Sequence, residues 1–213
     1  MRMKKLMLLI CFVLMFPPVA LAEVNADLRV KLGNSEGVDE LNIEGVPSPG
    51  SSTGAGNFQV EVDISPRQAS PVGYVFSAGL FGRTHSGDFI VIGQPARVDY
   101  RAGGLSLGAG AGVKASDRLH FEGKLELGLG SGELDLSTPG VIQRPRERGS
   151  YSSVSLIFGG YFTISQPGLQ VGLELGSRSF RGDFKIWNDA GFWNHGNVKG
   201  NGGIVNLVVG YRF

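Results

Sequence analysis

Two of the three histidines have carboxylates close by in the sequence, so they are the residues best suited to acid–base chemistry. His85, Ser86 and Asp88 supply the residue types of a nucleophile–base–acid arrangement. A working triad requires the acid to orient the histidine against the serine, and closeness in sequence does not define that geometry. We therefore interpret this segment as a polar loop and keep a catalytic role as an alternative.

The second histidine belongs to a charged series with two-residue spacing, formed by His120, Glu122, Lys124 and Glu126. In a strand this spacing places all four side chains on one face. An acid–base cluster or a metal site is one interpretation, but the series supplies a single imidazole and zinc sites usually need more. A salt network is the preferred interpretation. No dinucleotide, phosphate-loop or G-x-S-x-G motif follows a suitable strand, so we expect no metal and no cofactor.

The start of the chain has the form of a secretory signal peptide. Arg2, Lys4 and Lys5 precede the apolar stretch 6–16, and the small-x-small triplet 20–22 follows. The sequence predicts cleavage after Ala22, which leaves 23–213 as one domain. A retained membrane helix is the alternative, but the apolar stretch is too short and is interrupted by two prolines.

The overall charge excludes nucleic acid as a partner. The chain holds 20 basic and 19 acidic residues, and removal of the three basic residues of the signal peptide leaves a small acidic excess. The single cysteine, Cys11, lies within the signal peptide, so disulfides are not expected to stabilise the exported protein. Glycine is abundant, with 34 residues, and this requires a strongly constraining environment because glycine loses much backbone entropy on folding.

Two-residue alternation of apolar and polar side chains recurs along the chain and predicts strands. The alternating stretches are 28–32, 58–64, 72–83, 98–113, 119–129, 151–164, 169–178 and 205–213. Within 98–113 we expect Val98 and Tyr100 to point outward, and a phase change at Gly103-Gly104 predicts a β-bulge. The five tyrosines near strand ends are expected to form aromatic girdles.

The connections between these strands alternate between two lengths. Short polar turns are expected at 65–71, 114–118 and 165–168, and long loops at 33–57, 84–97, 131–150 and 182–201. Outer-membrane barrels have an even number of strands with short turns on the periplasmic side and long loops outside. The predicted fold is therefore all-β: an eight-stranded antiparallel up-and-down transmembrane β-barrel.

If the apolar faces point to lipid, the charged faces line the lumen of the barrel. Buried charges are tolerated only when they pair and hydrogen-bond, so we expect a lumen charge network. Its predicted members are Arg29, Lys31, Glu61, Asp63, Asp99, Arg101, His120, Glu122, Lys124, Glu126, Glu174, Arg178 and Arg212. A secreted β-sandwich or a lipocalin-like cup, with the apolar faces inside, is also compatible with alternation alone.

The last strand decides between these folds through a resemblance. Residues 205–213 alternate apolar side chains and end in Tyr211-Arg212-Phe213. This resembles the C-terminal signature of small bacterial outer-membrane β-barrel proteins similar to OmpA, OmpX and OmpW. The resemblance implies that Leu207, Val209, Tyr211 and Phe213 are the membrane-insertion signal read by the barrel-insertion machinery, and that the protein resides in the bacterial outer membrane. The resemblance does not identify a subfamily.

Three functions fit such a barrel. The first is a structural or surface-interaction role, with Trp187, Phe192 and Trp193 as loop contacts for an extracellular partner through 182–201. The second is a narrow pore for small solutes. The third is a lipid A-modifying enzyme, implied by the resemblance, with His85, Ser86, Asp88 or His120 as candidate catalytic residues. Arg144, Arg146 and Arg148 could contact lipopolysaccharide phosphates, although a solvated run of charges is the preferred interpretation.

Overall fold

The computed structural model describes residues 24–43, 45–66, 72–91, 93–137, 147–165, 168–187 and 193–213. The predicted signal peptide, its cleavage site and Phe192 lie outside these residues. Within the described ranges, no helix is long and apolar enough to span a bilayer.

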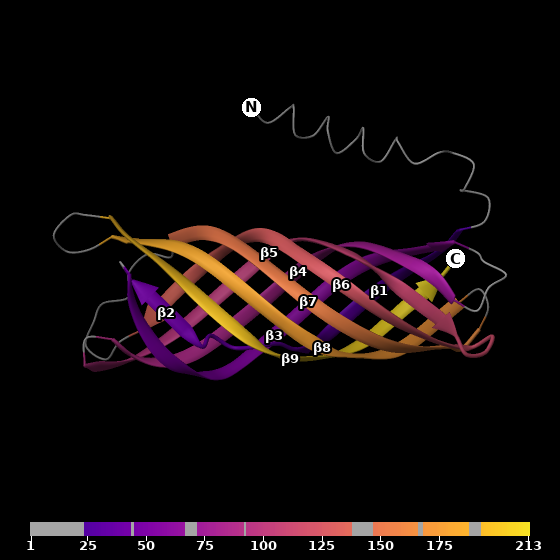
Figure 1. Ribbon diagram of the computed structural model, residues 1–213, viewed down its shortest axis with the longest axis horizontal. Helices are drawn as coiled ribbons and strands as arrows, with labels where there is room; N and C mark the ends of the chain where they lie inside the picture. The colour runs from indigo at the N-terminus through magenta and orange to yellow at the C-terminus, as the bar shows by residue number, and fades with distance from the viewer. Residues whose placement is uncertain are drawn as a thin grey trace, which may run out of the picture.

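The described residues form antiparallel strands joined into one ring (Figure 1). The strands are β1 (Val24–Asn34), β2 (Glu40–Ile43), β3 (Val46–Pro66), β4 (Val72–Val91), β5 (Gln94–Lys114), β6 (Leu119–Ser137), β7 (Glu147–Thr163), β8 (Gly168–Trp187) and β9 (Trp193–Arg212). Strands β3 to β9 pair in sequence order, and β1 pairs with both β3 and β9 to close the ring. The predicted eight-stranded up-and-down barrel is confirmed, because β1 and β2 share one position in the wall.

Strand β2 was not predicted from the sequence. It continues the wall position of β1 between β3 and β9, with Leu41 opposite Ser48 on β3 and Val198 on β9. Between β1 and β2, residues 35–39 leave the sheet, and Glu36, Gly37 and Val38 are buried. We call residues 35–39 the strap. Its backbone is held by Val38 N–H donating to Ser86 O (3.1 Å) and Asp39 N–H donating to Lys199 O (2.9 Å).

The strands are about twice as long as a bilayer requires. Strands β4, β8 and β9 have 20 residues each, whereas about 10 residues span the hydrocarbon. Much of each predicted long loop is therefore strand: β4 continues to Val91 and β5 resumes at Gln94, so the expected loop 84–97 is wrong. The sequence signal ended early because the outward positions of these extensions are mostly polar or charged, as at Thr84, Ser86 and Asp88 on β4.

An apolar belt surrounds one half of the barrel. Its outward side chains include Phe58, Leu80, Leu105, Leu127 and Leu207, and Leu207 is 67% exposed. Most inward side chains at the same level are charged, polar or glycine, and the apolar exceptions are Val75, Ile157, Ile204 and Val208. Such an apolar exterior over a polar interior is the arrangement of membrane barrels and the opposite of a water-soluble sandwich.

Strand β2 lies in the half of the barrel away from the C-terminus (Figure 1). In this half, beyond the belt, the outward positions become mostly polar and the inward positions apolar. On β5 the outward positions change from Leu105 to the charged residues Arg101, Asp99 and Arg97, while Val98 and Tyr100 are buried inside. The predicted outward orientation of Val98 and Tyr100 is wrong. The predicted bulge is also wrong, because pairing runs without a shift through Gly103, opposite Gly82 and Ser131. The inward–outward alternation of β5 is uninterrupted, but its outer face changes from lipid-facing to water-facing beyond the belt.

Candidate functional site

The lumen is filled by side chains in three levels, beginning near the end that holds the two chain ends of the described barrel. At this first level Arg29 on β1 donates from Nη1 and Nη2 to the carboxylate of Glu122 on β6, at 2.6 and 2.8 Å. Its guanidinium lies 3.8 Å from the ring centroid of Tyr161 and also pairs with Asp27 at 3.0 Å. Arg212 donates to both carboxylate oxygens of Asp27, each at 2.8 Å.

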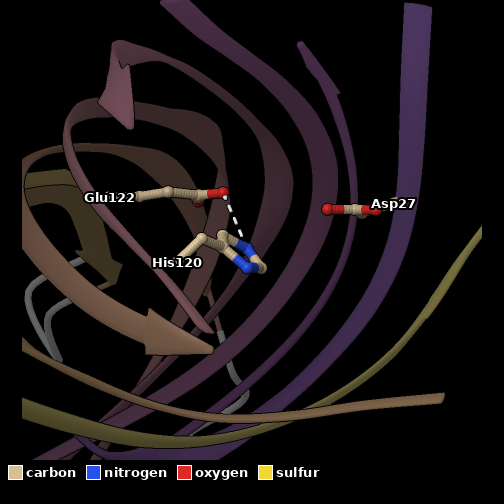
Figure 2. A group of neighbouring side chains, drawn as sticks. All are labelled: Asp27, His120 and Glu122. Carbon is tan, nitrogen blue, oxygen red and sulfur yellow. Dashed lines mark ion pairs between the residues drawn. The ribbon is translucent and has the colours of Figure 1, made fainter. Parts of the chain in front are cut away.

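The first level also contains a group of three potential metal ligands, the one such group found among the described residues. Asp27, His120 and Glu122 each offer one ligand atom, and these atoms lie within 4.8 Å of one another. Figure 2 shows the three side chains converging, with His120 Nε2 3.4 Å from Glu122 Oε1. However, the guanidinium groups of Arg29 and Arg212 lie 3.3 and 3.4 Å from His120 Nε2 and bind both carboxylates. Two cations thus occupy the lone pairs a metal would need, and the cluster is an ion-pair network.

The second level continues this network across the lumen. Lys31 lies 2.8 Å from both Glu61 and Glu174, and Lys124 pairs with Glu61 and with Asp63. The hydroxyl of Tyr161 donates to Glu174 at 2.6 Å and so joins the first level to the second. These side chains are fully or almost fully buried, as paired charges must be to be tolerated inside a protein.

The third level is built around two arginines. Arg83 donates to Glu126 (2.9 Å), Ser153 Oγ (2.8 Å) and Tyr151 Oη (3.2 Å). Arg178 donates to Ser155 Oγ at 2.8 Å. Arg83 was missed in the sequence because it stands at the end of its alternating stretch, although its inward position follows from Phe81 and Gly79 by two-residue spacing.

Above the third level the strap enters the lumen. Glu36 lies 3.9 Å from Arg178, and its backbone carbonyl is 2.8 Å from His85 Nδ1. Burial lowers the pKa of His85 to about 3 and raises the pKa of Glu36. Glu36 Oε1, His85 Nε2 and Arg178 Nη2 are buried without a hydrogen-bond partner among the described residues. Neither Glu36 nor His85 was placed in the lumen by the sequence prediction.

An apolar plug occupies the lumen beyond the third level. We use this name for the buried cluster of Val38, Leu41, Phe81, Phe89, Val98, Tyr100, Ala102, Leu134, Tyr151, Phe180, Phe184 and Val198. His85 stacks on Phe180 with ring centroids 3.9 Å apart, and Tyr151 lies 5.8 Å from Phe180. Tyr100, Tyr151 and Tyr161 are therefore inside the barrel, and the predicted girdle of five tyrosines is wrong for these three.

Several predicted site residues are placed elsewhere by the structure. Asp99 and Arg101 lie on the outer face of β5, so their assignment to the lumen is corrected; the polarity inversion of the strand accounts for it. His85 points inward while Ser86 and Asp88 point outward, and Ser86 Oγ donates to Asp99 at 2.6 Å. This geometry contradicts a triad of His85, Ser86 and Asp88, because the base and nucleophile face opposite sides of the wall.

The remaining predicted network residues lie in the lumen or at its rim, together with the unpredicted Asp27, Glu36 and Arg83. Leu207, Val209, Tyr211 and Phe213 point outward from β9 in the belt, where Tyr211 and Phe213 pack edge to face. Trp187 and Trp193 are opposite one another at the ends of β8 and β9. The conformations of these two indoles lie outside the description.

Comparison with known proteins finds similarity in fold only. No protein-family model matches the chain, and no curated protein matches it in sequence. The outer membrane protease OmpT from Escherichia coli aligns over 90% of this chain and 97% of its own, with a TM-score of 0.53 and 10% identity. A major outer membrane protein from Thermus thermophilus aligns over 89% and 99%, with a TM-score of 0.52 and 11% identity.

A lower score is found for Ail of Yersinia pestis, solved with the heparin analogue sucrose octasulfate (TM-score 0.43, 15% identity, 90% and 99% covered). The two alignments with TM-scores above 0.5 show that the chain has the fold of bacterial outer-membrane β-barrel proteins. The resemblance inferred from the last strand is confirmed at this level, with no subfamily specified.

Proposed function

We propose that this protein is a closed, non-conducting barrel of the bacterial outer membrane. Its projecting half, by which we mean the half beyond the belt that contains β2, is a rigid surface for interaction. The observation that carries the proposal is the filling of the lumen by the apolar plug above three levels of paired charges. A packed apolar core excludes water and ions, whereas a pore needs a continuous polar path. With the apolar plug inside and polar side chains outside, the projecting half has the polarity of a water-soluble barrel.

The alternative of a narrow pore is disfavoured by the same packing. The alternative of an enzyme is disfavoured because His85 is enclosed and His120 is engaged by two arginines. We further propose export by cleavage after Ala22 and insertion through the terminal strand. N-terminal sequencing of the membrane-extracted protein tests the cleavage, and fractionation tests the location.

Planar-bilayer recording of the refolded protein tests closure. We expect no discrete conductance steps from protein that shows the heat-dependent gel mobility of a folded barrel, with a porin as positive control in the same lipid. Reproducible single-channel steps from the wild-type chain would overturn the proposal. A variant with the plug aromatics reduced, Tyr151→Ala with Phe180→Ala, shows whether the recording detects an opened lumen.

A further inference from the structure

The outer wall of the projecting half contains a hollow of about 700 Å³ formed by residues of β2, β7, β8 and β9. Its side chains include Arg148, Arg181, Asp183, Lys185 and His195, all exposed. On β8 the charged lining residues Arg181, Asp183 and Lys185 are exposed and alternate with the buried Gly182 and Phe184, so the charged side chains lie on the outer face of the wall, although Phe184 also borders the hollow.

The hollow is suited to phosphate groups. Three cationic side chains, Arg148, Arg181 and Lys185, line it with a single carboxylate, Asp183. Arg148 pairs with Glu133 at 3.1 Å and Arg181 with Asp183 at 3.0 Å, and both arginines use Nε for these contacts. Among the described residues no partner of the two Nη groups is found, and a guanidinium can bind phosphate through two parallel hydrogen bonds. The existing pairs are solvent-exposed and therefore weak competitors.

The height of the hollow above the belt indicates which layer of the outer leaflet lies beside it. Arg148 and Arg181 each lie six residues beyond the last belt residue of their strand, Val154 and Leu175. Six residues extend about 20 Å along a strand. With the usual strand tilt this is about 15 Å above the hydrocarbon. In the outer leaflet this level belongs to the sugars that are attached to lipid A, beyond the acyl chains.

Exposed cations occur elsewhere on the outer wall, but the hollow lies on one side of it. On β4, the outward residues beyond the belt are Thr84, Ser86, Asp88 and Ile90, with no cation among them. On β5, Arg97 and Arg101 are outward cations at a comparable level but do not line the hollow. A general attraction to an anionic surface does not require a concave, one-sided site, whereas a bound oligosaccharide does.

We propose that this hollow binds the phosphorylated core oligosaccharide of lipopolysaccharide, and so holds the projecting half against the surrounding sugar layer. The inference rests on the proposed function, because it names a partner for the surface described there. Arg148 and Arg181 bind phosphate through their Nη groups, and Lys185 adds a third positive charge. The apolar belt below the hollow positions it, since the acyl chains and the core belong to one molecule.

The test is a binding titration with detergent-solubilised full-length mature protein. The probes are purified lipopolysaccharide with a complete phosphorylated core, the same material after removal of core phosphates, and lipid A alone. We expect the complete form to bind at least tenfold more tightly than the other two. Arg148→Gln with Arg181→Gln removes this difference, and the matched pair Arg97→Gln with Arg101→Gln keeps it within about twofold. Both variants must retain the heat-dependent gel mobility of the wild type.

Equal affinity for all three probes, or an equal loss in the two variants, would overturn the proposal. So would binding of free heparin through the same arginines without binding of the complete lipopolysaccharide, because the site would then serve soluble polysaccharide. The bilayer recording remains independent of these results. Conductance steps with normal core binding contradict only the closed lumen, and silent traces without core binding contradict only the hollow.

Discussion

Arg29 and Glu122 form a two-point ion pair, at 2.6 and 2.8 Å, that spans the bore of the barrel. Arg29 belongs to β1 and Glu122 to β6, and these strands are four places apart in either direction around the ring of eight wall positions. Two opposite walls are thus joined by a single pair of side chains. The pair therefore crosses the lumen at this level.

Removing one partner of this pair should be costly. Glu122→Gln leaves Arg29 with less compensating charge in a site where its side chain is 0% exposed. Loss of one member of a buried pair typically costs about 3–5 kcal/mol, because the remaining charge stays desolvated. We expect a decrease of this size in the free energy of unfolding, measured by urea titration of the protein in lipid vesicles.

The double variant Arg29→Met with Glu122→Leu is the control for this prediction. Replacing both charges by apolar groups removes the excess positive charge that the single variant leaves, while Asp27 keeps its pair with Arg212 and Asp63 its pair with Lys124, so most of the lost stability should return. A single variant within about 1 kcal/mol of wild type would show that the pair is not buried as described.

Acidification should destabilise the projecting half through His85. The folded protein leaves this histidine neutral down to a pKa of about 3, whereas the unfolded chain binds a proton near 6.5. Between these values the unfolded chain holds more protons, so the stability present above pH 6.5 is lost as the pH falls. The slope for one such group is at most about 1.4 kcal/mol per pH unit.

The readout is the unfolding free energy of wild type and His85→Phe between about pH 7.5 and 5, a range that spans the titration of the unfolded histidine. Phenylalanine keeps the stack on Phe180 and does not titrate, so the pH dependence should be smaller in the variant. Glu36 has a raised pKa and opposes the effect, but it is present in both proteins. His195→Gln, which removes an exposed imidazole, is the matched control. Parallel slopes in wild type and His85→Phe would exclude His85 as the source.

The sequence predicts the membrane-embedded half of this barrel well because lipid imposes a simple rule on outward positions. Outward positions that face lipid, such as Leu105, Leu127 and Leu207, must be apolar. The resulting two-residue alternation therefore identifies these strands without ambiguity. The rule reverses beyond the belt, where Arg101 faces water and Tyr100 is inside. If the apolar side chains of 98–113 all pointed outward, the strand would need a bulge at Gly103-Gly104, which the structure does not have.

The strap was hidden for a different reason. Glu36 and Val38 are buried in a segment without strand pairing, so no periodicity marks them. The short β2 has four residues, too few for an alternation signal. The available clue was the glycine content of β9, where Gly200 and Gly202 lie against the strap. Glycine composition alone does not show which residue approaches it.

Gly200 should therefore be needed for the strap to enter the lumen. A Cβ atom at this position would lie 2.1 Å from the carbonyl oxygen of Gly37 and 2.4 Å from the Phe180 ring. We expect Gly200→Ala to displace the strap and to speed amide hydrogen exchange at Val38, whose N–H donates to Ser86 O. Gly203→Ala is the matched control, since its nearest neighbour would be 3.8 Å away, and it should leave exchange unchanged. Equal protection of Val38 in both variants contradicts the packing of the strap.

The orientation of the belt can be tested on a single strand. Val209 and Asn201 are both outward residues of β9, but Val209 lies within the belt and Asn201 lies beyond it. An arginine near the bilayer midplane costs about 2–4 kcal/mol in a membrane barrel, and the cost falls towards zero at the interface. We expect Val209→Arg to lose stability of this order in vesicles and Asn201→Arg to remain close to wild type. A soluble barrel with the opposite interior would bury Val209 and place Asn206 on its surface, so for that fold Asn206→Leu should be nearly neutral. In the barrel described here Asn206→Leu removes buried hydrogen bonds to Asn57 and Glu174 and should destabilise the protein. Similar values for Val209→Arg and Asn201→Arg would contradict the placement of β9 in the membrane, because only lipid distinguishes the two positions.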